Sequence, residues 1–366
     1  MNDLRDVLER KRQLESHPDR GAFDRLLHLR TRRRRNERLG ALATALALLG
    51  GVAWAASSLG HLSSSTPKPV WPIDRSKTGV VRTLKLQTGS STTLAALAGS
   101  VWVGQNAVPE LTRIDPRTGR TLATIRTHGL PPHGTEGHAL ISDVVGAFDS
   151  IWTVDEGFGT VTRIDPRTNK IVARIRVGGN PTDAAEAAGS LWVLKPLDGR
   201  VYEINPLTNT VVARRKLLAS GEHGDIAGDR DGIVVRVGGR IVVIWANRSD
   251  PSGRAPIPNG DNAVALGANA LVADKRAGVV SEFDRGTCRL RRRFRVGTAP
   301  GALIVSHGVV WVADARDPIL TAIDEATNHA LLTLPIGRGV AELAVSGSSL
   351  WVLNKVDNSL TVVHVE

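Results

Sequence analysis

The stretch that decides the fold is SIWTVDEGFGTVTRIDPRTNKIVARIRV, residues 150–177. It holds three runs of strand-type residues, at 150–154, 161–165 and 171–177, and a fourth run precedes them at 141–145. The tryptophan triplet at 151–153 has four more copies, at 101–103, 191–193, 310–312 and 350–352. Trp152 and Trp192 are 40 residues apart, as are Trp311 and Trp351. A strand-type repeat of this period is typical of a β-propeller with one four-stranded blade per repeat.

The repeats add up to seven blades. Five copies carry the tryptophan, and Val234 and Val272 stand at the corresponding position of two degenerate copies. The last copy stops after its third strand, at 360–365, whereas residues 80–86 (VVRTLKL) match the fourth strand of another copy, IVARIRV at 171–177. We therefore predict an all-β, seven-bladed propeller over residues 80–366 with four-stranded antiparallel blades. Strand 80–86 is expected to close the ring within the last blade, which leaves no dangling edge.

Two repeated motifs are expected to be structural. An IDPxT-type motif at 114–118, 164–168, 204–208 and 323–327 falls between the third and fourth strands. Proline favours a turn there, and the Asp or Asn side chain can cap the loop amides. Gly119, Asn169, Asn209 and Asn328 fall where such a loop needs a left-handed residue. The tryptophans are expected to fill the wedge between neighbouring blades, so neither motif predicts a ligand set.

The first 79 residues do not follow the repeat. Residues 39–61 carry no acidic or basic side chain except His61, and this length is sufficient to span a bilayer. Six arginines lie between residues 30 and 38. The positive-inside rule then predicts a short helical cytoplasmic basic tail at 1–38, one transmembrane helix at 39–61 and an external propeller. Residues 62–79 form a Ser/Pro linker. A signal peptide cleaved near residues 53–55 (AWA) is the alternative.

The formal net charge of +11 is unevenly distributed, which bears on the partners. Residues 1–38 hold 12 Arg/Lys and 7 Asp/Glu, so much of the excess lies beside the predicted membrane span. We therefore expect a single-pass cell-membrane protein with its N-terminus inside and no nucleic-acid partner. A second basic run at 289–295 falls on a predicted outer strand, where charge blunts a sheet edge. Wall polymers or acidic lipid are alternative partners for this run.

Ligand contacts are expected on the face formed by the second-to-third-strand loops of the blades. These loops carry mixed charge around the predicted axis, which suits a polar ligand or a protein loop, although solvated loops have a similar composition. The candidate ligand-binding residues are Asn106, Glu110, Asp155, Glu156, Lys195, Lys275, Asp314, Arg316, Asn354 and Lys355. No Ser/His/Asp nucleophile arrangement, phosphate-binding glycine loop or dinucleotide fingerprint is present, and no catalytic residue is predicted.

The one insertion in the repeats is HGLPPHGTEGH at 128–138. It lengthens the spacing from Trp102 to Trp152 to 50 residues and falls on the same predicted face. His133, Glu136 and His138 form a candidate metal site for a divalent ion, although the spacing matches no common zinc motif. A Gly/Pro-rich loop with exposed histidines is the other interpretation. No other cofactor is expected.

The pattern (V/I/L)-W-V followed by L-T-x-I-D-P-x-T and an A-x-I-x-V-G-x-x-P strand resembles the YVTN-type β-propeller repeat. That family is related to the NHL, WD40-like and streptogramin (virginiamycin B) lyase-like propellers. The resemblance covers residues 80–366 and implies a membrane-anchored bacterial, extracytoplasmic binding module. We expect recognition of a protein, peptide or cell-envelope ligand, and no catalysis. The alternative is a metal-dependent lyase or hydrolase, because the lyase branch uses a histidine and magnesium site. The lyase repeat G-P-D-G-x-L-W-F-T-E is replaced here by AGSLWVL at 188–194.

Overall fold

The computed structural model describes residues 77–86, 91–129, 141–217, 219–246, 253–257 and 264–365. The predicted cytoplasmic tail, transmembrane helix and most of the linker lie outside these residues, so their assignments stay predictions. Within the described part, no helix is long and apolar enough to cross a membrane. The helical element found there is a single 3₁₀ turn, Glu156–Phe158.

The described residues form seven four-stranded antiparallel sheets, which confirms the predicted blade count. We letter the strands of each blade a to d from the ring axis outward. Blade 1 consists of β2 (Ser91–Leu97), β3 (Ser100–Gln105), β4 (Glu110–Ile114) and β5 (Thr121–Arg126). Blade 2 consists of β6 (Asp143–Ala147), β7 (Ser150–Asp155), β8 (Thr160–Asp165) and β9 (Lys170–Arg176). Blade 3 consists of β10 (Asp183–Ala187), β11 (Ser190–Lys195), β12 (Arg200–Asn205) and β13 (Thr210–Lys216).

The two degenerate copies also form complete blades. Blade 4 consists of β14 (Gly224–Gly228), β15 (Gly232–Val237), β16 (Arg240–Trp245) and β17 (Gly253–Pro256). Blade 5 consists of β18 (Val264–Leu266), β19 (Ala270–Asp274), β20 (Val279–Phe283) and β21 (Leu290–Arg295). Blade 6 consists of β22 (Pro300–Ser306), β23 (Val309–Asp314), β24 (Ile319–Asp324) and β25 (Ala330–Pro335). Blade 7 consists of β26 (Val340–Ser346), β27 (Ser349–Asn354), β28 (Ser359–His364) and β1 (Gly79–Lys85).

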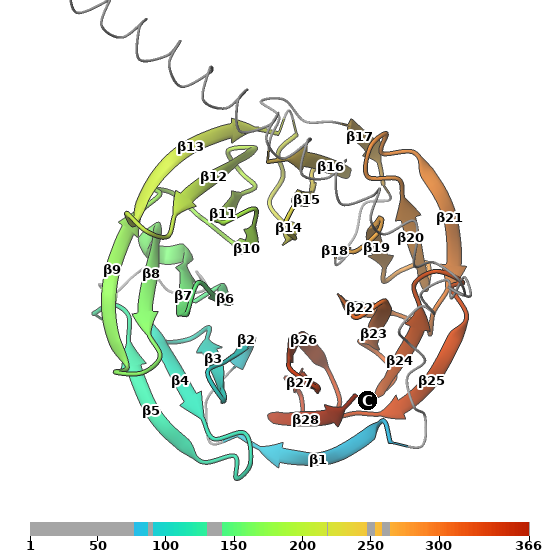
Figure 1. Cartoon of the computed structure of the whole chain (residues 1–366), viewed down its shortest axis with the longest axis horizontal. Helices are drawn as coiled ribbons and strands as arrows, with labels where there is room; N and C mark the ends of the chain where they lie inside the picture. The colour runs from blue at the N-terminus through green and yellow to red at the C-terminus, as the bar shows by residue number, and fades with distance from the viewer. Residues whose placement is uncertain are drawn as a thin grey trace, which may run out of the picture. The chain divides into compact units, whose positions relative to one another are not determined.

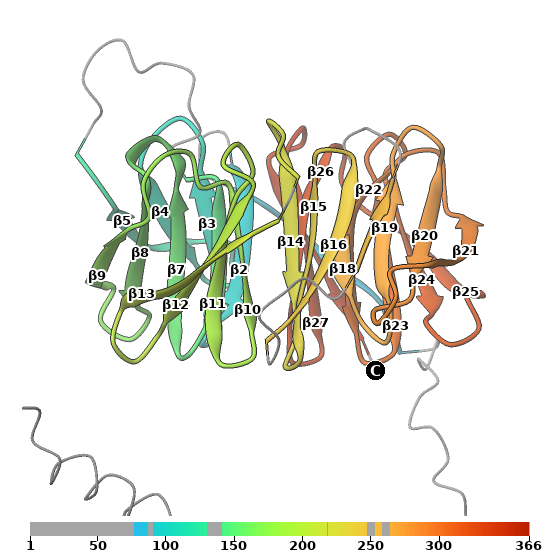
Figure 2. The ribbon, with the colours of Figure 1, turned by 90° about the horizontal axis from the view of Figure 1, so that it is seen from above.

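The seven sheets stand around one axis, with the a strands innermost and the d strands outermost (Figure 1). Figure 2 shows that the inner strands run roughly along this axis. The a strands therefore begin on one face of the ring, which we call the d–a face because the connections from d to the next a lie there. The b–c loops lie on that same face, because each b strand runs antiparallel to its a strand.

The ring is closed by the N-terminal strand, as predicted. β1 pairs antiparallel with β28, from Gly79 opposite His364 to Lys85 opposite Ser359. Leu86 extends the pairing, since its backbone N–H donates to the carbonyl of Asn358 at 2.9 Å. The outer strand of the last blade thus comes from the opposite end of the propeller sequence.

The hydrophobic core lies between the blades. In the described part of the chain, seven clusters of buried side chains each join two neighbouring blades. Trp152 of blade 2 packs in the cluster shared with blade 3, and its indole N–H donates to the carbonyl of Ala147 at 3.0 Å. The five repeat tryptophans are between 0% and 6% exposed, which confirms their role as core residues.

The c–d turns confirm the second structural motif. The Asp165 carboxylate accepts the backbone N–H of Arg167 at 2.8 Å, and this hydrogen bond lowers the pKa of Asp165. Asn169 completes the turn with a φ of 58°. The other three predicted left-handed residues also have positive φ: Gly119, Asn209 and Asn328. The Asp165 side chain is engaged by its own loop, whereas Asn169 and Asn209 accept hydrogen bonds from Arg113 and Arg163 of the preceding blades.

Candidate functional site

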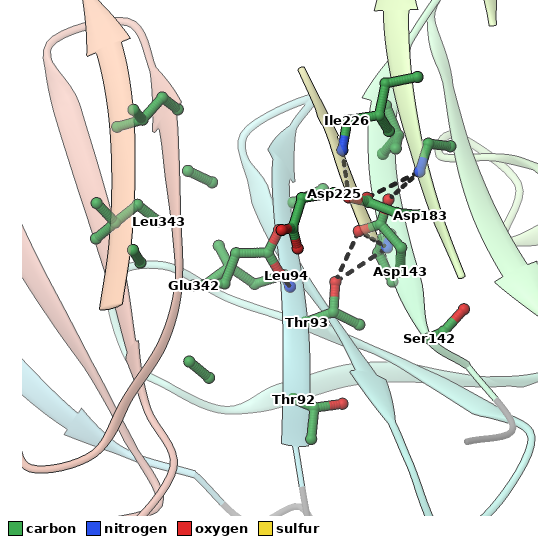
Figure 3. Close-up of a pocket in the computed structure, with 18 of the residues that line it drawn as sticks. Thr92, Thr93, Leu94, Ser142, Asp143, Asp183, Asp225, Ile226, Glu342 and Leu343 are labelled. Atoms are coloured by element: carbon green, nitrogen blue, oxygen red, sulfur yellow. Dashed lines mark hydrogen bonds between the residues drawn. The ribbon is translucent and has the colours of Figure 1, made fainter. Parts of the chain in front are cut away.

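The inner strands surround an axial pocket of about 490 Å³. Its lining comes mainly from the first half of the a strands, so it lies toward the d–a face. Blades 5 and 6 contribute apolar residues such as Val264, Ala302 and Leu303. The opposite side carries hydroxyl and carboxyl groups from blades 7 and 1 to 4 (Figure 3). In the described part of the chain, the pocket therefore has one apolar and one acidic side.

The acidic side arises from one strand position. In each a strand this residue pairs with the residue just before the end of the b strand, as Asp143 pairs with Val154. The equivalent pairs place a polar side chain there in five blades: Thr93, Asp143, Asp183, Asp225 and Glu342. Blade 6 has Ala302 at this position, and the blade 5 equivalent, residue 263, lies outside the described residues.

Four of these side chains link blades 7, 1, 2, 3 and 4 in order around the ring. Glu342 of blade 7 accepts the backbone N–H of Leu94 in blade 1 at 2.8 Å. The Asp143 carboxylate accepts the N–H of Ala184 at 2.9 Å, and Asp183 accepts that of Ile226 at 2.9 Å. The hydroxyl of Thr93 accepts the N–H of Val144 at 3.0 Å. Innermost strands do not share a sheet, so these hydrogen bonds satisfy edge amides that would otherwise face the pocket.

The carboxyl groups are held close together in a partly dry environment. Burial raises the pKa of Asp183 well above its usual value, and the charges of Asp143 and Asp225 raise it further. Burial likewise raises the pKa of Glu342, with the charge of Asp143 adding to the effect. The pKa of Asp143 is also raised by burial, although hydrogen bonds from Asp183 and from backbone amides oppose this. A cation bound in the pocket would stabilise the ionised form of these carboxyl groups.

A pH experiment tests this description of the pocket. Between the ordinary carboxyl pKa, about 4.3 for Glu, and the raised value, the folded state binds more protons than the unfolded chain. The contribution of Glu342 to stability therefore falls as the pH rises through that window. Glu342→Gln keeps an oxygen for the Leu94 amide but cannot ionise, so we expect it to melt higher than the wild type at pH 8 and to gain less at pH 4.

The measurement is a series of thermal melts from pH 4 to pH 8. The matched control is Glu222→Gln, which removes an exposed carboxylate outside the pocket lining. Its melting temperature should follow the wild type across the series. A Glu342→Gln curve parallel to the wild type would contradict the raised pKa.

The predicted ligand residues fall into two groups by exposure. Four of them end a b strand and are buried: Asp155, Lys195, Asp314 and Asn354. The other six lie in b–c loops or beside them and are partly or fully exposed: Asn106, Glu110, Glu156, Lys275, Arg316 and Lys355. The four buried residues thus stand at the ends of their b strands, beneath the b–c loops. A ligand that approached this face would meet the other six residues before these four.

Asp155 is fully enclosed. Its carboxylate is 0% exposed and accepts hydrogen bonds from Thr127 at 3.1 Å and from Thr162 at 2.6 Å. His128 lies 3.3 Å from the same carboxylate and stacks on Phe158 with ring centroids 4.1 Å apart. Asp155 therefore fixes the beginning of the insertion loop to the b–c loop of blade 2.

Of the other three buried residues, Lys195 and Asp314 hold loops, and Asn354 joins its b strand to the c strand of blade 7. The Lys195 ammonium pairs with Asp198 at 2.6 Å and lies 5.0 Å from the centre of the Tyr202 ring. Asn354 donates to Thr361 at 2.9 Å. The Asp314 carboxylate accepts the backbone N–H groups of 298, 299, 316 and 317. Although burial alone would raise the pKa of Asp314, these hydrogen bonds hold it below its usual value.

Two of the exposed candidates are brought together. Lys275 and Arg316, from the b–c loops of blades 5 and 6, line a second cavity of about 400 Å³ with Arg276. Alanines 299 and 315 complete its lining. This cavity is basic, in contrast to the axial pocket.

The candidate metal residues His133, Glu136 and His138 lie outside the described residues, so the divalent-metal prediction stays a prediction. Among the residues that are described, no group of three or more His, Cys, Asp or Glu side chains is arranged to hold a metal ion. The lyase or hydrolase alternative depends on those three residues, so it stays a prediction as well.

The axial carboxyl residues were not predicted from the sequence. A signal for them exists: each precedes an apolar residue near the start of an a strand, and Asp143 and Asp183 are one period of 40 residues apart. The turn aspartates obscured this signal, because they repeat more regularly. Only the ring brings residues as distant as Thr93 and Glu342 to the same pocket.

No family model and no curated protein sequence matches this chain. Its structure is similar to a streptogramin B lyase, with 12% identity, a TM-score of 0.65, and 79% of this chain and 98% of that chain covered. It is also similar to the virginiamycin B lyase from Staphylococcus aureus, with 14% identity, a TM-score of 0.63, and 77% of this chain and 98% of that chain covered. A chain of the Mitotic Checkpoint Complex is similar as well, with 13% identity, a TM-score of 0.66, and 83% of this chain and 97% of that chain covered. The class defined by fold and comparisons is the seven-bladed β-propeller, and identities this low carry the fold alone.

Proposed function

We propose that this chain is a membrane-anchored extracytoplasmic binding module that recognises a protein, peptide or cell-envelope ligand. The anchor is the apolar segment 39–61, with the N-terminus inside and the propeller outside. The ligand approaches the d–a face and inserts a basic, partly apolar group into the axial pocket. The two-sided lining of that pocket is the observation that carries the proposal.

The size of the pocket supports recognition of one group rather than of a whole chain. A cavity of about 490 Å³ is within the range that holds a small ligand or a long side chain. A lysine or arginine side chain matches both sides of the pocket, since its alkyl stem can contact the apolar side while its charge meets the carboxyl groups. A cation in the pocket favours the ionised carboxylate, so ligand binding would oppose the upward shift of the pKa of Asp183 and of Glu342.

The d–a face can also accommodate a ligand larger than one side chain. Glu110, Glu156 and Lys355 lie in or beside the b–c loops on the same face as the entrance, are partly or fully exposed, and present both signs of charge. Such a rim favours orientation and selectivity over tight binding. The pocket would then anchor one residue while the rim positions the rest.

The test uses the full chain in detergent and a set of fluorescent peptides of equal length that are basic, neutral or acidic. We expect the basic peptides to bind tightest at pH 7. The double variant Asp183→Asn with Glu342→Gln should weaken that binding about tenfold or more, because the cation would lose its charged partners.

Asp149→Asn serves as the control here, because Asp149 is exposed in the a–b turn of blade 2 on the opposite face of the ring, and it should leave the affinity unchanged. Equal binding of acidic and basic peptides would contradict the proposal. So would a double variant that binds the basic peptides as tightly as the wild type while melting at a similar temperature.

A further inference from the structure

The outer strand of blade 5 carries an unusual density of positive charge. Arginines occupy five of the seven positions from 289 to 295, all are exposed, and no acidic residue falls among them. Arg291 contacts Asp284 at 3.3 Å, and Arg292 pairs with Glu282. For Arg289, Arg293 and Arg295, no acidic partner is found among the described residues. This strand therefore has more cations than its own blade neutralises.

Two of these arginines, Arg293 and Arg295, lie in one row on the outer edge of the sheet. β21 is the edge strand of its sheet, so it has no strand outside it. Alternate residues of a strand point to the same face, which puts Arg293 and Arg295 in one row about 6.6 Å apart. A β-bulge between Glu282 and Phe283 interrupts this alternation at Arg291, whose guanidinium turns to the same carboxylate, Glu282, as that of Arg292. A guanidinium group binds phosphate through two parallel hydrogen bonds, so the row suits a chain of repeated phosphate groups.

The row continues onto the d–a face. Arg295 pairs with Val279 at the start of β20, three residues after Arg276. There the basic cavity of about 400 Å³ is lined by Lys275, Arg276 and Arg316. Together these residues form what we call the cationic track of blade 5, which consists of Arg289, Arg291, Arg293, Arg295, Lys275, Arg276 and Arg316.

The carboxylates near this track are largely engaged elsewhere. Asp274 accepts the backbone N–H groups of 276 and 277, both at 3.0 Å. Asp314 is 4% exposed and accepts four backbone amides, as described above. Asp317 accepts the Thr298 hydroxyl at 2.7 Å and is the partly exposed acid nearest to Arg316 in sequence. The cavity thus keeps three cationic side chains at its surface.

The shape of the track distinguishes between kinds of anionic partner. The outer strands on either side of β21 are β17, with the single cation Arg254, and β25, whose sequence ALLTLP has no charge (Figure 1). The charge is therefore one strand wide, which fits a linear chain better than a flat lipid surface. Phe294, the aromatic residue of β21, is partly buried against the core cluster between blades 5 and 6, so the strand offers no fully exposed ring on which bases could stack.

We propose that the cationic track of blade 5 binds a linear phosphate-bearing polymer other than a nucleic acid. The polymer lies along β21, and one of its phosphate groups occupies the basic cavity at the end of the strand. This surface is on the outer edge of the ring and uses none of the axial carboxyl groups, so it goes beyond the function proposed above.

The experiment measures binding of inorganic pyrophosphate and of long-chain polyphosphate to the full chain in detergent near physiological salt. The wild type should bind the long chain more tightly, because more charges are neutralised. The triple variant Arg289→Gln, Arg293→Gln and Arg295→Gln should weaken long-chain binding about tenfold or more and leave pyrophosphate binding nearly unchanged. Lys275→Gln with Arg316→Gln should weaken both.

The matched control removes three exposed cations from other outer strands, in Lys170→Gln, Arg176→Gln and Lys216→Gln. It has the same net charge as the triple variant and should bind polyphosphate like the wild type. An equal loss of polyphosphate binding in the control would show that only the net charge matters, and this result would overturn the proposal. Absence of length dependence, or anionic vesicles or single-stranded DNA bound as tightly as polyphosphate, would overturn it as well.

Discussion

Deletion of residues 80–87 should abolish the cooperative unfolding transition of the whole propeller. The deletion removes the outer strand of blade 7 and exposes the edge of β28 along its length. It also removes Leu84 and Leu86 from the core cluster between blades 7 and 1. Burial of each large aliphatic side chain contributes about 1.5–3 kcal/mol, whereas a domain is stable by only about 5–15 kcal/mol. Calorimetry is the measurement, and an unchanged melt would refute the role of this strand.

A rescue variant separates loss of the strand from general damage. Gly79 lies opposite His364, so the beginning of β1 is beside the end of β28. Residues 79–86 can therefore be moved to the C-terminus of the deleted chain through a short turn that copies 165–169, the c–d turn of blade 2. We expect this rearranged chain to recover a single transition. Failure to recover would mean that residues 80–87 act through more than their place in blade 7.

Trp152→Ala should lower the free energy of unfolding by about 3–5 kcal/mol, the range for a large aromatic residue in a packed core. The Trp152 side chain is 0% exposed, and its loss would leave a cavity between blades 2 and 3. It would also remove the platform for Arg163, whose guanidinium carbon lies 5.0 Å from the centre of the ring. Arg163 in turn donates to Asn209 in the c–d turn of blade 3 at 2.9 Å, so the damage should extend to the next blade.

Chemical denaturation of the full chain measures this loss, with two comparison variants. Trp152→Phe keeps most of the buried ring and should cost clearly less than Trp152→Ala. Leu122→Ala changes a side chain that is 54% exposed on an outer strand and should stay within about 0.5 kcal/mol of the wild type. A Trp152→Ala loss no larger than that of Leu122→Ala would show that the wedge between the blades is not held by the tryptophan.

The elements predicted from the sequence are those whose signals are local. A c–d turn such as 165–169 is specified by its own proline, its Asx cap and its left-handed residue, so it could be recognised without knowing its neighbours. The b strands were recognised in the same way, from a tryptophan in an apolar triplet. Blade 4 lacks the tryptophan in its b strand but keeps the tight turn at Gly238 and Gly239, both with positive φ, between β15 and β16.

The candidate site was harder to predict because its signal is not local. Exposed loop charges drew attention to the b–c loops, yet Asp155 and Asn354, at the ends of their b strands, are 0% exposed. Whether an aspartate at a strand end faces solvent or caps a loop depends on threonines from other strands, as Thr127 and Thr162 do for Asp155. The axial carboxyl groups could not be predicted, because a single Asp at the start of a short strand does not by itself indicate a site.

The sequence by itself determined the number of blades, the order of strands within each blade and the closure of the ring by residue 80 onward. Each of these follows from side-chain periodicity and turn chemistry within one 40-residue unit, repeated along the chain. Only the tertiary structure decided which side chains meet at the axis. Thr93, Asp143, Asp183, Asp225 and Glu342 come from five blades, and burial beside one another changes their acidity, which no isolated repeat could do. The charge of the axial pocket is therefore a property of the closed ring.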